Sequence, residues 1–112
     1  MANPIAEINL QNLYHNCTYI KSIVGNSKLF PVVKANAYGH GVKIITQFLN
    51  KKDIINGFCV ATEQEAEELI SYKIDKPIFI LGKTNFLNSN LLSYQNIIPT
   101  FHSLNEIRQF KS

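Results

Sequence analysis

The chain has 112 residues, which is enough for one small domain with a hydrophobic core. Its hydrophobic content of 46% and charged content of 17% are typical of a soluble globular protein, and its net charge of +3 comes almost wholly from lysines spread along the chain. Because there is no basic block and no interleaving of basic with aromatic residues, we expect no nucleic-acid partner. No apolar run approaches membrane-spanning length and the first ten residues lack a signal-peptide pattern, so we expect no membrane partner.

The first part of the chain predicts a lead-in followed by a helix. Residues 5–10 alternate in polarity, which indicates a strand or an extended lead-in. Asn9 can cap a helix over about residues 11–24, whose apolar stripe consists of Leu13, Cys17, Ile20 and Val24. Gly25 and Asn26 predict that this helix ends with a residue in the left-handed conformation.

A strand, a lysine, a turn and a helix follow. Residues 30–33 form a short apolar run that is typical of a strand buried on both faces, and Lys34 ends it. Residues 42–49 then predict a helix, whose apolar side consists of Ile44, Ile45, Phe48 and Leu49. A βα unit presents reactive groups at the carboxyl end of its strand, and a lysine in an apolar pocket can lose its proton and form a Schiff base. The alternative is that Lys34 is a surface lysine after a strand.

The rest of the chain repeats the alternation of strands and helices. Residues 57–61 predict a second strand, and residues 62–65 form a capping box that starts a helix through about Tyr72 with Ala66, Leu69 and Ile70 on its inner face. Residues 78–81 predict a third strand that Gly82 ends, and residues 86–94 predict a weaker helix. A fourth strand is expected over residues 97–101, although Pro99 interrupts it, and a second capping box over residues 103–106 starts the last helix.

Four successive βα units imply a parallel sheet with right-handed crossovers. Such a chain could form a small open sheet or the first half of a (βα)8 barrel. The two cysteines, Cys17 and Cys59, fall in a predicted helix and a predicted strand, which is typical of reduced core thiols in a cytoplasmic protein. We expect no metal site, because the acidic cluster over residues 63–68 is explained by a helix start and a solvated helix face.

The stretch Val-Val-Lys-Ala-Asn-Ala-Tyr-Gly-His-Gly, residues 32–41, resembles without a gap the pyridoxal-phosphate (PLP) attachment motif of the alanine racemase family. Weaker matches follow in the family's order over residues 6–10, 57–62, 77–82 and 99–103. The resemblance implies an α/β fold in which residues 1–112 are the N-terminal half of a (βα)8 TIM-type barrel, with about four βα units. The C-terminal half-barrel and the β domain of the family would be absent.

The resemblance also implies a function and a set of site residues. Lys34 would carry PLP as a Schiff base and would act as one of two catalytic bases in the interconversion of L-alanine and D-alanine. Tyr38 would donate a hydrogen bond to the cofactor phosphate, and Leu81 would either line the cofactor pocket or belong to the barrel core. The second base and the remaining phosphate contacts would lie beyond Ser112, and the full-length parent would be a cytoplasmic homodimer.

The histidines are expected to have structural roles, His40 between two glycines of the motif and His102 as a packing or capping group; His15 lies on a helix face. Two alternatives to a racemase remain open at this point. One is another PLP barrel protein, such as an amino-acid decarboxylase or a PLP-homeostasis protein. The other is a non-catalytic truncated remnant. If the chain is the N-terminal part of a racemase, the free 112 residues are expected to have no useful racemase activity.

Overall fold

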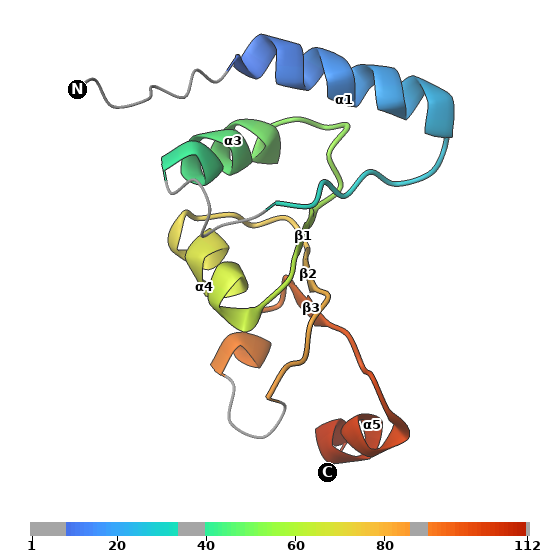
Figure 1. Ribbon diagram of the computed structural model, residues 1–112, viewed down its shortest axis with the longest axis vertical. Coiled ribbons are helices and arrows are strands. Elements are labelled where there is room, and N and C mark those ends of the chain that lie inside the picture. The colour runs from blue at the N-terminus through green and yellow to red at the C-terminus, as the bar shows by residue number, and fades with distance from the viewer. Residues whose placement is uncertain (1–8, 34–39, 86–89, 112) are drawn as a thin grey trace, which may run out of the picture.

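The computed structural model describes residues 9–33, 40–85 and 90–111. Within these ranges, His40 and Lys111 are described by their backbone alone. From α3 onward, helices and strands alternate (Figure 1), which confirms the expected α/β class. In chain order the elements are α1 (Leu10–Val24), α3 (His40–Asn50), β1 (Phe58–Val60), α4 (Glu63–Ser71), β2 (Ile78–Ile80), the 3₁₀ helix η1 (Asn90–Ser93), β3 (Ile97–Pro99) and α5 (Leu104–Lys111).

The three strands form one parallel sheet in the order β1-β2-β3. The strand predicted over residues 30–33 is reduced to an isolated parallel bridge between Val32 and Cys59. Two backbone hydrogen bonds hold it beside β1, from the Val33 N–H to the Cys59 carbonyl (2.9 Å) and from the Cys59 N–H to the Pro31 carbonyl (2.8 Å). The parallel sheet is therefore confirmed. The four-unit half-barrel is not, because the first unit has no regular strand among the described residues.

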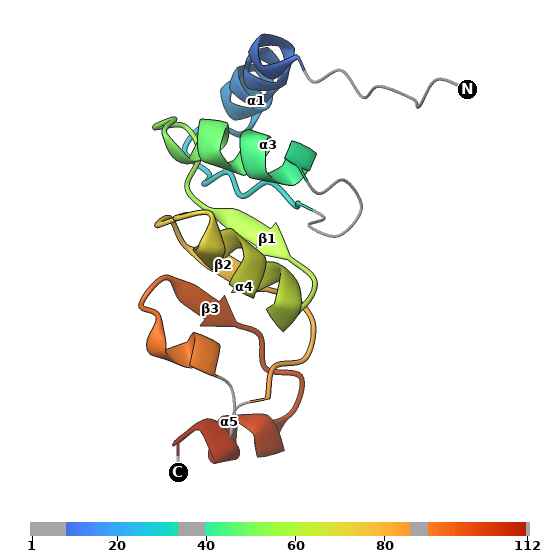
Figure 2. The same cartoon turned by 90° about the vertical axis from the view of Figure 1, so that its left-hand side faces the viewer.

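One face of the sheet carries the core. The side chains of Phe58, Val60, Ile78 and Ile80 are 0% exposed and belong to one buried cluster with residues of α3 and α4. These two helices lie on the same side of the sheet (Figures 1 and 2). The helices contribute buried apolar residues to this cluster, among them Val42, Leu49, Ala66 and Leu69. Burying apolar surface at about 25 cal/mol per Å² makes this face the main source of stability in the described structure.

The opposite face of the sheet is only partly covered. Residues 32, 59, 79 and 98 share one register row and alternate with the buried row, so they point away from α3 and α4. Val32 is 65% exposed, so the prediction of a strand buried on both faces is wrong here. The Phe30 ring packs edge-on against Phe79, with 5.0 Å between centroids. The radius of gyration is 15.8 Å, against about 13 Å for a compact domain of this length, which fits an open layer.

Local sequence signals determine where α1 and α4 begin. The Asn9 side chain accepts a hydrogen bond from the Asn12 N–H (3.0 Å), and α1 ends at Gly25, whose φ is +64°. In α4 the Glu65 N–H donates to the Thr62 hydroxyl while the Glu65 carboxylate accepts from the Thr62 N–H, which is the predicted capping box. No helix in the described ranges is both long and apolar enough to cross a membrane.

Three details of the predicted helices are wrong. The apolar stripe of α1 is buried only over its first half, because α1 packs on α3 there, with Tyr14 edge-on to Phe48; Ile20 and Val24 are exposed. Ile44 of α3 is likewise exposed rather than packed. The helix expected over residues 86–94 is a single 3₁₀ turn within its described part. In α1 and α3 the packing partner, rather than the local apolar pattern, decides which side chains are buried.

Polar side chains secure the edge at which the strands begin. Asn56 accepts a hydrogen bond from the Leu29 N–H (2.8 Å) and thereby ties residues 29–33 to the start of β1. The Lys76 ammonium donates to the carbonyls of residues 52 and 55, and the Asn96 amide donates to those of residues 74 and 76. These bonds join the segments that precede each strand. The polar side chains at the amino ends of the strands therefore have a structural role. A functional site is expected at the carboxyl ends, where parallel α/β folds place their functional residues.

Candidate functional site

The residues that follow the strands meet at the carboxyl edge of the sheet, since all the strands run in parallel. Lys34 and Tyr38 lie outside the described residues. Val33, the residue directly before Lys34, is held on this edge by its hydrogen bond to the Cys59 carbonyl. The point from which the chain continues into the motif is therefore fixed beside the end of β1.

Leu81 lies at the carboxyl end of β2, next to this point in the sheet order. Its N–H donates to the Val60 carbonyl (2.9 Å), which extends the pairing of β2 with β1 by one residue. Its side chain is 49% exposed. The apolar Leu81 side chain is thus available at the carboxyl edge in this chain, and the two roles that the sequence left open, cofactor pocket and barrel core, both stay predictions.

Gly82 allows the loop after β2 to lie directly against the loop after β1. The Gly82 N–H donates to the Ala61 carbonyl (2.9 Å), and a Cβ built at Gly82 would lie 2.3 Å from the same carbonyl oxygen. Real Cβ atoms do not approach an oxygen so closely. Only glycine therefore fits at this position without a shift of the backbone.

We expect Gly82→Ala to destabilise the chain by about 1–3 kcal/mol, the usual cost of forcing an extra carbon into a close-packed place. Chemical denaturation of the two proteins measures this directly. Lys83→Ala is the matched control, because Lys83 is the exposed next residue of the same loop. Equal stabilities of the Gly82→Ala variant and the unsubstituted chain would show that the backbones do not approach as described.

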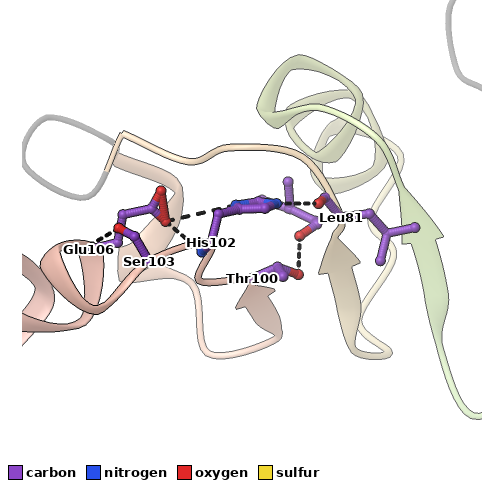
Figure 3. A network of polar contacts seen from close by, with 6 residues as sticks. Leu81, Thr100, His102, Ser103 and Glu106 are labelled. Carbon is purple, nitrogen blue, oxygen red and sulfur yellow. Dashed lines mark hydrogen bonds and ion pairs between the residues drawn. The ribbon is translucent and has the colours of Figure 1, made fainter.

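A network of polar contacts joins the ends of β2 and β3 (Figure 3). The Thr100 hydroxyl donates to the Ile80 carbonyl (2.7 Å), and the Nε2 atom of His102 lies 3.1 Å from the Leu81 carbonyl oxygen. The Glu106 carboxylate accepts a hydrogen bond from the His102 N–H (2.8 Å). Sequence reasoning named His102 but missed its contact with Leu81. The i, i+4 spacing of His102 and Glu106 was a signal for their pairing.

The helix N-termini at the carboxyl edge differ in charge. The first turn of α4 contains Glu63 and Glu65, and the Glu65 carboxylate already accepts the N–H groups of Ala61 (2.8 Å) and Thr62 (3.0 Å). The first turn of α5 contains Glu106. The first turn of α3, which begins at His40 within the lysine motif, has no acidic residue. An anionic group is therefore disfavoured at α4 and α5, while at α3 no carboxylate opposes it.

Neither metal ligation nor thiol chemistry is indicated by the described residues. They contain no group of three or more His, Cys, Asp or Glu side chains that could hold a metal ion. Cys17 and Cys59 are free thiols, and burial raises the pKa of both. A raised pKa disfavours the thiolate, which is the nucleophilic form of cysteine.

Comparison with known proteins adds an independent finding. Residues 8–112 match the family model described as alanine racemase, N-terminal domain. The alanine racemase of Carboxydothermus hydrogenoformans is 37% identical over 97 residues, which are 87% of this chain and 26% of the relative. The alanine racemase of Francisella tularensis subsp. novicida is 32% identical over 107 residues, 96% of this chain and 28% of the relative.

Solved structures agree with the sequence relatives. The alanine racemase from Oenococcus oeni superposes with a TM-score of 0.79 at 27% identity, over 93% of this chain and 29% of that one. A histidine racemase from Leuconostoc mesenteroides subsp. sake has a TM-score of 0.76 at 26% identity, over 90% of this chain and 27% of that one. This chain thus spans between a quarter and a third of the length of these proteins. It belongs to the alanine racemase family and matches the N-terminal domain of that family.

Proposed function

We propose that this chain is the PLP-binding N-terminal part of an alanine racemase and that Lys34 is the residue to which PLP attaches. The observation that carries the proposal is the ungapped motif over residues 32–41, which begins on the sheet at the Val32–Cys59 bridge. A lysine at the carboxyl end of a parallel strand is well placed to meet a ligand held by the loops of that edge. The family match over residues 8–112 supports the same assignment.

The described surroundings fit the cofactor. The phosphate of PLP is an anion, and α3, which begins within the motif, has no acidic residue in its first turn to oppose it. Tyr38, two residues before α3, would donate a hydrogen bond to that phosphate. The half-exposed side chain of Leu81 offers apolar surface for the pyridine ring. Lys34, Tyr38 and Leu81 are thus the proposed cofactor-binding residues.

The chemistry of racemisation is divided between cofactor and protein. Bound PLP acts as an electron sink that makes the Cα proton of alanine removable. The proposed role of the Lys34 amine, once it is free of the cofactor, is to remove or return that proton on one face of Cα. A second base is needed on the opposite face of Cα, and the family resemblance implies that another part of the family enzyme supplies it.

The proposal includes a half-barrel fold for this chain and a homodimer for the complete enzyme. The partly covered sheet face, with Val32 and Cys59, would line the interior of a (βα)8 barrel, of which residues 1–112 would form the N-terminal half. By the same family resemblance we propose that the complete enzyme is a cytoplasmic homodimer with alanine as its substrate.

The proposal is tested by locating the lysine that binds PLP. The eleven basic residues include one arginine, Arg108, so ten lysines compete for the cofactor. The purified chain is incubated with PLP and reduced with borohydride, and the modified lysine is identified by peptide mass. We expect the modification to concentrate on Lys34. Modification scattered over the exposed lysines, or none, would contradict the proposed site and would favour a non-catalytic remnant.

A further inference from the structure

The peptide group between Leu81 and Gly82 is hydrogen-bonded at both of its ends. Its N–H, that of Gly82, donates to the Ala61 carbonyl (2.9 Å) in the loop after β1. Its carbonyl, that of Leu81, lies 3.1 Å from Nε2 of His102 in the loop after β3 (Figure 3). Rotation of this peptide group would break both bonds. The two bonds thus hold the backbone that follows the Leu81 Cα atom, and the Leu81 side chain itself is half-exposed.

His102 takes the place that a backbone donor would occupy in a longer sheet. The last backbone pair of β2 and β3 is Ile80 with Pro99. Beyond that pair, the Thr100 hydroxyl bonds the Ile80 carbonyl and the His102 ring bonds the Leu81 carbonyl. A carbonyl oxygen can only accept, so Nε2 of His102 carries the hydrogen. Beyond the last backbone pair, the side chains of Thr100 and His102 thus continue the hydrogen bonding between β2 and the segment that follows β3.

The position of His102 is determined in turn by α5. The His102 N–H donates to the Glu106 carboxylate (2.8 Å), and Nδ1 of its ring lies 3.8 Å from the same oxygen. The Glu106 N–H donates to the Ser103 hydroxyl (3.2 Å), which caps the helix. The Glu106 carboxylate of α5 therefore helps to hold His102 next to the Leu81 carbonyl. A displacement of α5 would accordingly alter the hydrogen bond between His102 and Leu81.

We propose that His102 is a positioning residue for PLP binding, because it holds the Leu81–Gly82 peptide group and so directs the Leu81 side chain toward the cofactor. The inference rests on the proposed function, since it presupposes PLP at Lys34. His102 itself does not touch the cofactor in this scheme. The net free-energy contribution of a hydrogen bond of this kind corresponds to a change of about threefold to tenfold in an equilibrium constant.

The test compares His102→Ala with His102→Gln, which keeps a side-chain N–H donor. The first readout is the PLP concentration that half-saturates borohydride-trapped label at Lys34. The second is hydrogen exchange of the Gly82 amide without PLP. We expect His102→Ala to weaken PLP binding by about threefold to tenfold and to speed the exchange by a similar factor. His102→Gln should restore much of both, and His15→Ala, an exposed histidine of α1, should change neither.

A double-mutant cycle separates positioning of Leu81 from a general structural effect. In a Leu81→Ala background the side chain that His102 directs is absent, so His102→Ala should no longer weaken PLP binding, although it should still speed exchange at Gly82. Additive losses of PLP affinity would overturn the positioning role.

Three further results would count against parts of the scheme. Unchanged Gly82 exchange in His102→Ala would show that the histidine does not hold the peptide group. Faster exchange with unchanged PLP affinity would show that the contact is structural only. If the unsubstituted chain is not labelled at Lys34, the proposed function itself fails and the role of His102 toward PLP fails with it, whatever the exchange experiment shows.

Discussion

Replacing Lys34 by alanine is expected to lower alanine racemisation by at least about a thousandfold, because one substitution removes both the cofactor anchor and a catalytic base, and loss of acid–base catalysis alone costs about 10²–10⁴. The effect is best measured in a chimaera. This chain would replace the matching 26% of the Carboxydothermus hydrogenoformans alanine racemase, which supplies the remaining residues of the family enzyme. The readout is the rate of D-alanine formation from L-alanine with PLP in excess.

Lys28→Ala is the matched control, because Lys28 is an exposed lysine just before residues 29–33, at the other end of the same segment. The Lys28→Ala chimaera should be as active as the unsubstituted one. Substantial activity of the Lys34→Ala chimaera would show that another lysine binds PLP. A chimaera that racemises histidine but not alanine, the activity for which one structural neighbour is named, would leave Lys34 in place and overturn the substrate proposal.

The Phe58→Ala variant is expected to be destabilised by about 3–5 kcal/mol, the usual cost of deleting a fully buried phenylalanine side chain. Phe58 is 0% exposed and is among the largest fully buried side chains of the described residues. It lies in β1, between the bridge to Val32 and the pairing with β2. Small domains are stable by about 5–15 kcal/mol, so this loss leaves little or no folded protein in mild urea. Urea denaturation followed by circular dichroism measures it.

The control is Phe110→Ala, the same substitution in α5, where the side chain is 49% exposed and packs edge-on against Phe101. A loss below about 1 kcal/mol is expected there, since most surface substitutions have small effects. If the two variants unfold at the same urea concentration, the buried face of the sheet is not the core of the chain in solution.

Short-range signals were sufficient for the parts of the fold that are formed by neighbouring residues. The capping box of α4 is such a case, because Thr62 and Glu65 satisfy one another's backbone groups within a single turn. The Asn9 cap of α1 is another. Alternation of apolar strands and amphipathic helices likewise predicted a parallel sheet, which the structure confirms. These features depend on spacings of three or four residues, which can be counted in a sequence.

Burial was less predictable than element type. Ile20 and Ile44 lie on apolar stripes of their helices and are nevertheless exposed, because a stripe indicates which face is apolar but not how far its packing partner extends. The apolar run over residues 30–33 has the same ambiguity. Whether such a run is buried on one face or on two depends on which elements cover it, and Val32 is 65% exposed.

By itself, the sequence determined the class of fold, the ends of two helices, the family resemblance and the lysine on which the proposed chemistry depends, since all of these are carried by contiguous residues. Only the tertiary structure decided that Gly82 lies against Ala61, that Leu81 is exposed at the carboxyl edge, and that His102 reaches Leu81 from 21 residues away. The physical reason is that parallel strands bring their carboxyl ends together across long crossovers. Contacts at that edge therefore join residues whose separation in sequence is set by the intervening helices.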